Sequence, residues 1–163
     1  MKKLGFALVI VVSLILNCLF AFGEDALGPI PPIPEKFKNI QIIKPDPSVP
    51  KEIADFSGEW EGVWKFVGRG SGWSYGEELR KAKFIIYEIS TSKVKFVYGV
   101  APNLKSARGG GWRDYSSDIR DFQDKKYISF MPPSGYALEF HLEDGLLKGV
   151  EGGKSSIEMK RIK

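Results

Sequence analysis

Two glycine-containing stretches of the sequence combine aromatic residues with cations. One reads GRGSGWSYGEELRK from residue 68, and the other reads APNLKSARGGGW from residue 101. An aromatic face packs against a ring, and a lysine or arginine donates hydrogen bonds to an anionic group. The combination would suit a sugar ring, an aromatic acid or an anionic lipid headgroup. The candidate ligand-binding residues are Arg69, Trp73, Tyr75, Lys105, Arg108 and Trp112.

The same stretches also fit a second interpretation, in which they are mobile connectors. Their tryptophan and tyrosine side chains would then fold back and plug the domain rather than bind a ligand. Loops carried on a rigid scaffold are where binding residues concentrate, so both interpretations stay open at this point.

The sequence offers no recognisable catalytic constellation. Serine catalysis needs a base beside the hydroxyl, and no serine has an identifiable one. His141 is the only histidine, and the alternation of its expected strand sends it to the outer face. No loop supplies a recognisable cluster of oxygen ligands for calcium. We therefore expect a protein that is not an enzyme and that needs no cofactor or metal.

Asp114 and Asp118 form the carboxylate pair with the most interesting placement. The stretch WRDYSSDIRD puts both on one face of an expected strand. If that face points inward, the two carboxylates and Arg120 line the lumen, where a costly buried charge indicates a site. We expect the other face, which carries Tyr115, to point inward and both acids to lie on the surface.

The elements that position these residues are strands. From Phe56 onward, apolar residues recur with period two, and turn residues interrupt the pattern at short intervals. The pattern predicts eight strands, at 57–67, 82–90, 93–100, 111–120, 126–131, 135–142, 145–151 and 155–162. No convincing helix separates them, so sequence neighbours should pair antiparallel, and closure would remove the exposed edges. We predict an all-β, eight-stranded antiparallel up-and-down barrel.

A meander of this kind sorts its connections between two ends. The short connections at 90–93, 121–125 and 143–144 should lie at one rim. The connections at 68–81, 101–110, 132–134 and 152–154 should lie at the other. The candidate ligand-binding residues would therefore gather at a loop-rich barrel mouth.

The stretch SGEWEGVWKFVG begins the barrel. Period two puts Trp60, Gly62, Trp64 and Phe66 on one face, which we expect to point inward. Glycine between the two tryptophans would make room for both indoles and let the strand bend sharply. At the other end of the chain, the alternation of SSIEMKRI points Arg161 toward the core face, so its guanidinium could lie over the Trp60 indole and close that rim.

Together, the Gly58-Glu59-Trp60 start, the meander and the late Arg161 resemble the lipocalin and wider calycin group. A short helix expected in SVPKEIADF, with Ser48 as its cap, adds to the resemblance, which covers roughly residues 48–163. The resemblance implies a ligand-binding barrel in which Gly58, Trp60 and Arg161 serve structural closure. The chain departs from a typical lipocalin in lacking a disulfide and a long C-terminal helix, which argues against a deep lipid cavity.

A secretory signal is expected at residues 1–23. Lys2 and Lys3 form a basic start, a long apolar run follows, and Ala21 and Gly23 provide the small residues at which a signal peptidase cleaves. The protein is therefore predicted to be secreted or periplasmic, and a retained membrane anchor is the alternative.

Cys18 provides a further alternative, because a cysteine after an apolar run can be the lipid-modified start of a bacterial lipoprotein. Asn17 precedes it, where such a signal resembles one expecting glycine, alanine or serine. Lipid anchoring through Cys18 is therefore kept as a minority alternative.

Residues 24–50 form a proline-rich segment between the signal and the barrel domain, residues 51–163. This segment holds seven of the ten prolines, so it should be extended and semi-rigid, either a tether or an arm along the domain.

The net charge of the chain without its signal is small. Removing the two signal lysines from the 24 basic residues leaves 22, against 20 acidic residues, which gives a net charge of +2. This balance gives no argument for binding nucleic acid or a membrane surface.

Three functions remain in competition. The first is a small-ligand binder for a carbohydrate, lipid or anionic metabolite, and a cavity lined by Phe96, Tyr98 and Tyr136 would favour it. The second is a protein-interaction or inhibitor module of the cell envelope, and a filled barrel with an aromatic rim would favour it. The third is a hydrolase, which would need two carboxylates in the lumen.

Overall fold

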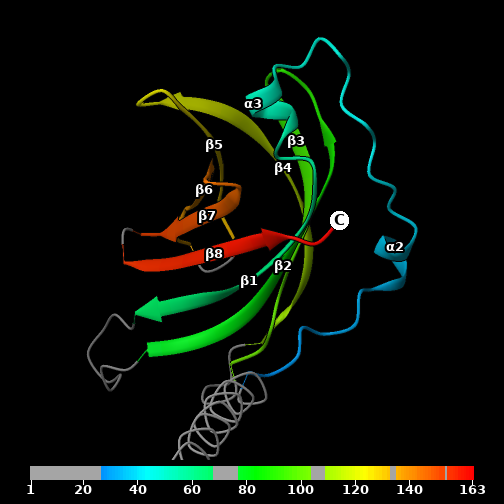
Figure 1. Ribbon diagram of the computed structural model, residues 1–163. Coiled ribbons are helices and arrows are strands. Elements are labelled where there is room, and N and C mark those ends of the chain that lie inside the picture. The colour runs from blue at the N-terminus through cyan, green and yellow to red at the C-terminus, as the bar shows by residue number, and fades with distance from the viewer. Residues whose placement is uncertain (1–26, 68–76, 104–108, 133–134, 153) are drawn as a thin grey trace, which may run out of the picture.

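The computed structural model of the chain is a closed barrel of eight antiparallel strands, which confirms the predicted fold class (Figure 1). It describes residues 27–67, 77–103, 109–132, 135–152 and 154–163. Each strand pairs with the next, and β8 returns to pair with β1. The strands are β1 Gly58–Val67, β2 Glu77–Ile89, β3 Lys93–Val100, β4 Gly111–Phe122, β5 Lys125–Phe130, β6 Leu138–Glu143, β7 Leu146–Glu151 and β8 Ser155–Arg161.

Two short helices precede the barrel, α2 Glu35–Lys38 and α3 Lys51–Ala54. Within the described ranges, no helix has the length and apolar character needed to cross a membrane. We call the end of the barrel at which α3 lies the α3 end. The loop end is the opposite one, where β1 ends at Val67 and β2 begins at Glu77.

Two strand boundaries differ from the prediction by three residues or more. Strand β2 begins at Glu77 rather than at residue 82, because its first residues pair with the end of β1 although several of them are charged. Strand β6 begins at Leu138 rather than at residue 135. Tyr136 therefore precedes the strand, and it is 49% exposed instead of lining the lumen.

Aromatic rings from several strands meet in the middle of the barrel. The ring centroids of Phe84 on β2 and Phe140 on β6 lie 4.7 Å apart. Those of Phe96 on β3 and Phe130 on β5 lie 4.8 Å apart. At these separations the rings are in contact, so Phe96, Tyr98 and Tyr136 do not together line the cavity that would favour a small-ligand binder.

Gly62 lets β1 and β8 approach closely. Trp60 and Trp64 on either side of it are buried, as the alternation predicts. A Cβ atom at Gly62 would lie 2.1 Å from the carbonyl oxygen of Glu158 and 2.9 Å from the Cα atom of Met159. The atoms nearest to Gly62 thus belong to the β8 backbone, not to the indoles for which the sequence suggested it makes room.

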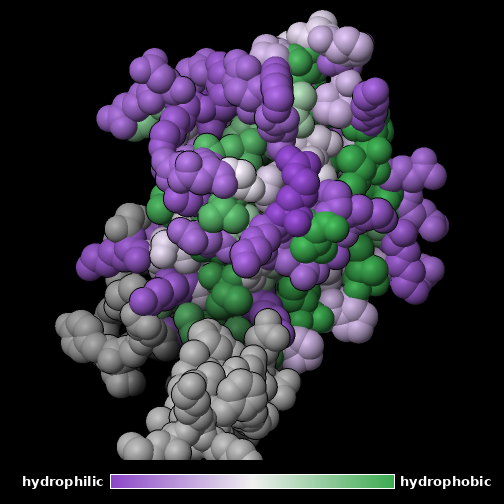
Figure 2. Space-filling model, viewed as in Figure 1, coloured by the Kyte–Doolittle hydropathy of each residue, from purple (hydrophilic) through white to green (hydrophobic). Residues whose placement is uncertain are grey.

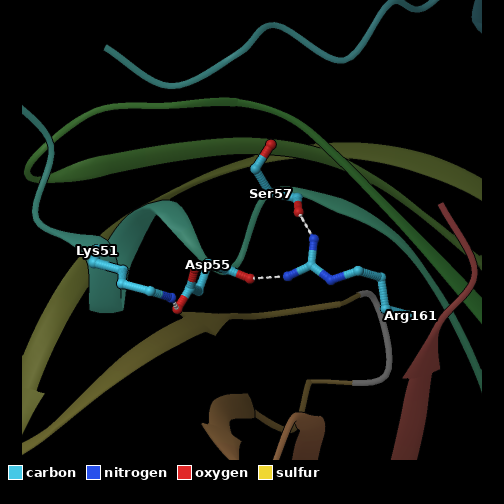
Figure 3. Close-up of polar contacts among 4 residues, drawn as sticks. All are labelled: Lys51, Asp55, Ser57 and Arg161. Atoms are coloured by element: carbon cyan, nitrogen blue, oxygen red, sulfur yellow. Dashed lines mark hydrogen bonds and ion pairs between the residues drawn. The ribbon is translucent and has the colours of Figure 1, made fainter. Parts of the chain in front are cut away.

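Arg161 and Trp60 close the α3 end. The guanidinium carbon lies 4.3 Å from the centre of the Trp60 ring, which is a cation–π geometry. The guanidinium also donates hydrogen bonds to the carbonyl oxygens of Ser57 and Asp55 (Figure 3). A Cβ atom at Gly58 would lie 2.6 Å from Nη1 of Arg161. Glycine is therefore needed where the guanidinium crosses the start of β1.

Helix α3 covers this end with apolar side chains. Ile53 and Phe56 are buried in the main core, and the Trp60 indole donates to the Phe56 carbonyl oxygen at 2.9 Å. The predicted capping role of Ser48 is wrong. Pro50 occupies the N-cap position, and the Ser48 hydroxyl donates to the Asp46 carboxylate at 2.7 Å instead.

The arm, residues 27–50, lies along the outside of β2 and β3. Phe37 on α2 packs with Ile85 and Val97 in a second apolar cluster, and the Ile43 amide donates to the Tyr87 carbonyl oxygen at 2.8 Å. The chain runs past α2 to α3 along one side of the barrel (Figure 1), and hydrophobic residues gather on that side in Figure 2. Helix α2 was not predicted, because its four residues carry too little periodicity to detect.

Replacing Phe37 by alanine should release the arm without unfolding the barrel. Loss of a buried phenylalanine costs about 3 kcal/mol or more, and local opening responds to local contacts. Hydrogen exchange of the Ile43 amide should accelerate by about a hundredfold, while amides of β2 and β3 that pair within the barrel keep their rates. Lys38→Ala, on the exposed side of the same helix, is the control. Equal acceleration in the arm and barrel would show that they unfold together.

Candidate ligand-binding site

The structure describes only one of the six candidate ligand-binding residues. Arg69, Trp73, Tyr75, Lys105 and Arg108 lie outside the described residues. The sixth residue, Trp112, lies on the outer face of β4, not at the inner face of the loop end.

Trp112 is held beneath the arm. Its indole lies flat on Gly99 of β3, where a Cβ atom would come within 2.6 Å of the ring. The indole nitrogen donates to the Pro31 carbonyl oxygen at 2.7 Å. Because Trp112 pairs with Gly99 on the outer face, it has a structural partner in this chain. Its grouping with the loop cations in a binding site stays a prediction.

Asp114 and Asp118 are exposed on the outer face of β4, as expected. Asp114 forms an ion pair with Lys36 of the arm, at 3.6 Å. His141 is also on the outer face, where its ring centroid lies 5.1 Å from that of Tyr127. Burial and the nearby Lys125 lower the pKa of His141 below its ordinary value. None of these groups faces the lumen.

Charged side chains do face the lumen at the loop end, but they come from residues that the sequence analysis did not single out. On β2, Arg80 pairs with Trp64 and Glu78 pairs with Phe66. Directly paired residues of antiparallel strands share a face, so both charges share the inner face with the aromatic residues. On β7, Glu151 pairs with the buried Leu138 and Ser155, which puts it on the same face.

Arg80 is anchored to the backbone. Its side chain is only 11% exposed. Its Nε donates to the Ala101 carbonyl oxygen at 2.7 Å, and its Nη2 donates to the Gly109 carbonyl oxygen at 3.3 Å. The guanidinium carbon also lies 5.6 Å from the centre of the Phe66 ring. These contacts compensate part of the cost of withdrawing the cation from water.

Glu78 is the counter-ion of Arg80, but their geometry is that of an ion pair and not of a hydrogen bond. Oε1 of Glu78 lies 3.6 Å from Nε of Arg80, which already donates to Ala101. Oε1 is buried and accepts no hydrogen bond from the residues that the structure describes. The Glu78 side chain as a whole is 24% exposed. The site thus presents a buried acceptor oxygen for which the described residues provide no donor.

An aromatic floor lies beneath the two charges. The rings of Trp64 and Phe66 are stacked with centroids 5.3 Å apart. The Trp64 indole nitrogen donates to the Tyr98 hydroxyl oxygen, and Tyr98 is buried. Burial raises the pKa of Tyr98, whereas the hydrogen bond from Trp64 and the Arg80 cation oppose the rise and Glu151 adds to it. Tyr98 is therefore a neutral hydroxyl at the junction of the charged and apolar layers.

A signal for this site exists in the sequence, although it is indirect. Extending the period-two pattern backward from Phe84 and Ala82 puts Arg80 and Glu78 on the inner face. Charged residues are poor strand signals, so the stretch reads as a loop when taken alone. In the described part of the chain, no three acidic, histidine or cysteine side chains gather in a way that could hold a metal ion.

The fold and the site define an eight-stranded antiparallel barrel with a charged cluster at the inner face of one end. In comparisons with known proteins, no family model, no curated protein and no solved structure matches the chain.

Proposed function

We propose that this protein is a secreted or periplasmic binding protein that takes a small ligand at the loop end of a calycin-like barrel. The observation that carries the proposal is the pair Glu78–Arg80, which lies on the inner face and is largely withdrawn from water. Charge inside a barrel is costly for folding, so its presence beside aromatic side chains indicates a recognition site.

The aromatic layer sets the size of the ligand. Rings from β2 and β6 meet at 4.7 Å below the charged pair. A ligand that contacts Glu78 and Arg80 would therefore occupy only the loop end and would be too short to reach the α3 end. A compact polar molecule fits this arrangement better than a long acyl chain.

The calycin-like relationship rests on the α3 end. The contacts among Gly58, Trp60 and Arg161, together with a short helix before the first strand, support it. Export rests on the basic and apolar residues 1–23. Determination of the N-terminal residue of the protein isolated from its host tests export, because a chain that still begins at Met1 would contradict it.

Ligand binding at the loop end is tested by NMR with the isotope-labelled protein. The probes are maltotriose, chitotriose, benzoate, phosphate and choline, each at millimolar concentration. We expect at least one probe to shift the amide signals of Arg80, Val100 and Glu151. We also expect Arg80→Met to weaken that binding about tenfold, because the variant removes the cation that holds Glu78 in place.

Arg120→Met is the matched control, since Arg120 is exposed on the outer face of β4. Its affinity should equal that of the natural protein, and the unfolding midpoints of both variants should be measured alongside. Shifts confined to the outer face or the α3 end would contradict the proposal, as would the absence of shifts for every probe.

A protein-interaction or inhibitor module is the second candidate, and the filled barrel favours it. Its surface would be the outer face of β4, β5 and β6, where Phe122 is 62% exposed. The rings of Phe122 and Tyr127 lie 6.2 Å apart, and His141 continues the row. Cross-linking the protein to envelope proteins, with Phe122→Ser for comparison, tests this candidate.

A further inference from the structure

The geometry points to a neutral, polyhydroxylated ligand, a short carbohydrate, whose hydroxyl group donates to Oε1 of Glu78. This inference rests on the proposed function and adds the chemical class of the ligand. It comes from three features of the loop end, namely the unsatisfied oxygen, the alternation of charges and the aromatic side chain beside them.

The first feature is the acceptor. Oε1 of Glu78 is buried and accepts no hydrogen bond within the described part of the chain. Nε of Arg80 does not supply the donor, because it lies 3.6 Å from Oε1, beyond hydrogen-bond distance, and donates to the Ala101 carbonyl oxygen instead. A buried acceptor without a donor is destabilising, and such exceptions call for a bound partner. A hydroxyl of a ligand would supply the missing donor.

The second feature is the arrangement of charge around this oxygen. A cationic ligand that approaches Oε1 would meet Arg80, whose Nε lies 3.6 Å from the same atom. An anionic ligand that approaches Arg80 would meet Glu78 and, across the barrel, Glu151, which shares the inner face. Opposed charges at close range penalise both signs of ligand. A neutral hydroxyl donates to the carboxylate without either penalty.

The third feature is the aromatic side chain. Phe66 pairs with Glu78 across the β1–β2 ladder, and it is only partly buried. Its ring is stacked on Trp64 at 5.3 Å, which fixes its orientation. A pyranose ring has an apolar C–H face and a polar rim of hydroxyl groups. It can pack against the part of the Phe66 ring that Trp64 and the Arg80 guanidinium leave uncovered, while a hydroxyl reaches the carboxylate. The filled layer below limits the ligand to a few sugar units.

Calorimetric titration distinguishes the ligand classes. The neutral probes are maltotriose and chitotriose, the anionic probe is benzoate and the cationic probe is choline. We expect a neutral probe to bind and Glu78→Gln to weaken it about tenfold, because a neutral amide oxygen is a weaker acceptor than a carboxylate. Glu139→Gln, on the exposed outer face of β6, is the control and should bind as the natural protein does.

The variant also separates the competing explanations. Benzoate that binds at the loop end, and binds more tightly to Glu78→Gln, would overturn the inference and keep the proposed function. Choline that binds there, and loses affinity in Glu78→Gln, would do the same. A sugar whose affinity does not change in Glu78→Gln would overturn the assigned role of Glu78. If no probe shifts the loop-end amide signals, both the inference and the proposed function fail.

Discussion

Replacing Phe84 by alanine is expected to lower the free energy of unfolding by about 3–5 kcal/mol, the cost of removing a fully buried phenylalanine. Phe84 is inaccessible to solvent and lies at the centre of the aromatic layer. Its ring lies close to rings on three other strands, those of Phe140 at 4.7 Å, Phe96 at 4.8 Å, Tyr98 at 5.0 Å and Phe130 at 5.9 Å. These strands are held apart by the barrel, so they cannot collapse into the space that the ring leaves.

Urea unfolding followed by tryptophan fluorescence measures the effect. Phe84→Leu is the comparison, because it keeps most of the volume and should cost less than half as much as Phe84→Ala. If the alanine variant lost less than about 1 kcal/mol, the lumen around Phe84 would be able to relax or to hold water, and a hollow barrel would be the better description.

A second large effect is expected at Gly62, where alanine should destabilise the barrel by about 3 kcal/mol or more. The added methyl carbon would lie 2.1 Å from the Glu158 carbonyl oxygen, well inside van der Waals contact. That oxygen belongs to a backbone paired on both sides, with β1 and with β7. The clash can be relieved only by moving β8 away from β1, at the ladder that closes the barrel.

Gly109→Ala is the matched control, because nothing lies within 4 Å of the added carbon at that position. Its unfolding free energy should stay within about 0.5 kcal/mol of that of the natural protein, as is usual for exposed substitutions. A Gly62→Ala variant as stable as the control would contradict the close approach of β1 and β8 and, with it, the closure of the barrel at this ladder.

Phe84→Ala and Gly62→Ala both test whether the barrel is filled and closed, and the proposed function depends on that property. Because the barrel is filled in its middle and closed at the α3 end, we place the proposed ligand at the loop end. The charged pair at that end contributes little to the apolar core. We therefore expect substitutions of Glu78 to affect ligand affinity more strongly than stability.

Much of the fold follows from alternation along the strands. Inward-facing residues such as Trp60, Trp64 and Phe96 are buried where period two puts them. Asp114 and Asp118 are exposed for the same reason. The contact between Arg161 and Trp60 also follows, because in a closed meander the first strand starts where the last one ends. These features depend on local pattern and strand order, which the sequence carries directly.

The start of β2 and the contacts of Trp112 could not be predicted, because the period-two pattern of apolar residues is weak there. The sequence pattern does not predict the start of β2, because Glu78 and Arg80 are charged residues that face inward. A period-two pattern identifies inward positions by their apolar residues. Trp112 was assigned to a binding role because its neighbours are glycines and cations. Its actual partner, the Pro31 carbonyl group, is 81 positions away in the sequence.

The sequence by itself therefore determined the number of strands, their order and the face on which most side chains lie. Only the tertiary structure decided that rings from β2 and β6 meet across the lumen, that the arm covers Trp112, and that Oε1 of Glu78 lacks a donor among the described residues. The physical reason is the separation in sequence over which each property is set. Alternation is a property of neighbouring residues, whereas the filling of a barrel and the satisfaction of a buried acceptor depend on distances between strands that pairing and closure set together.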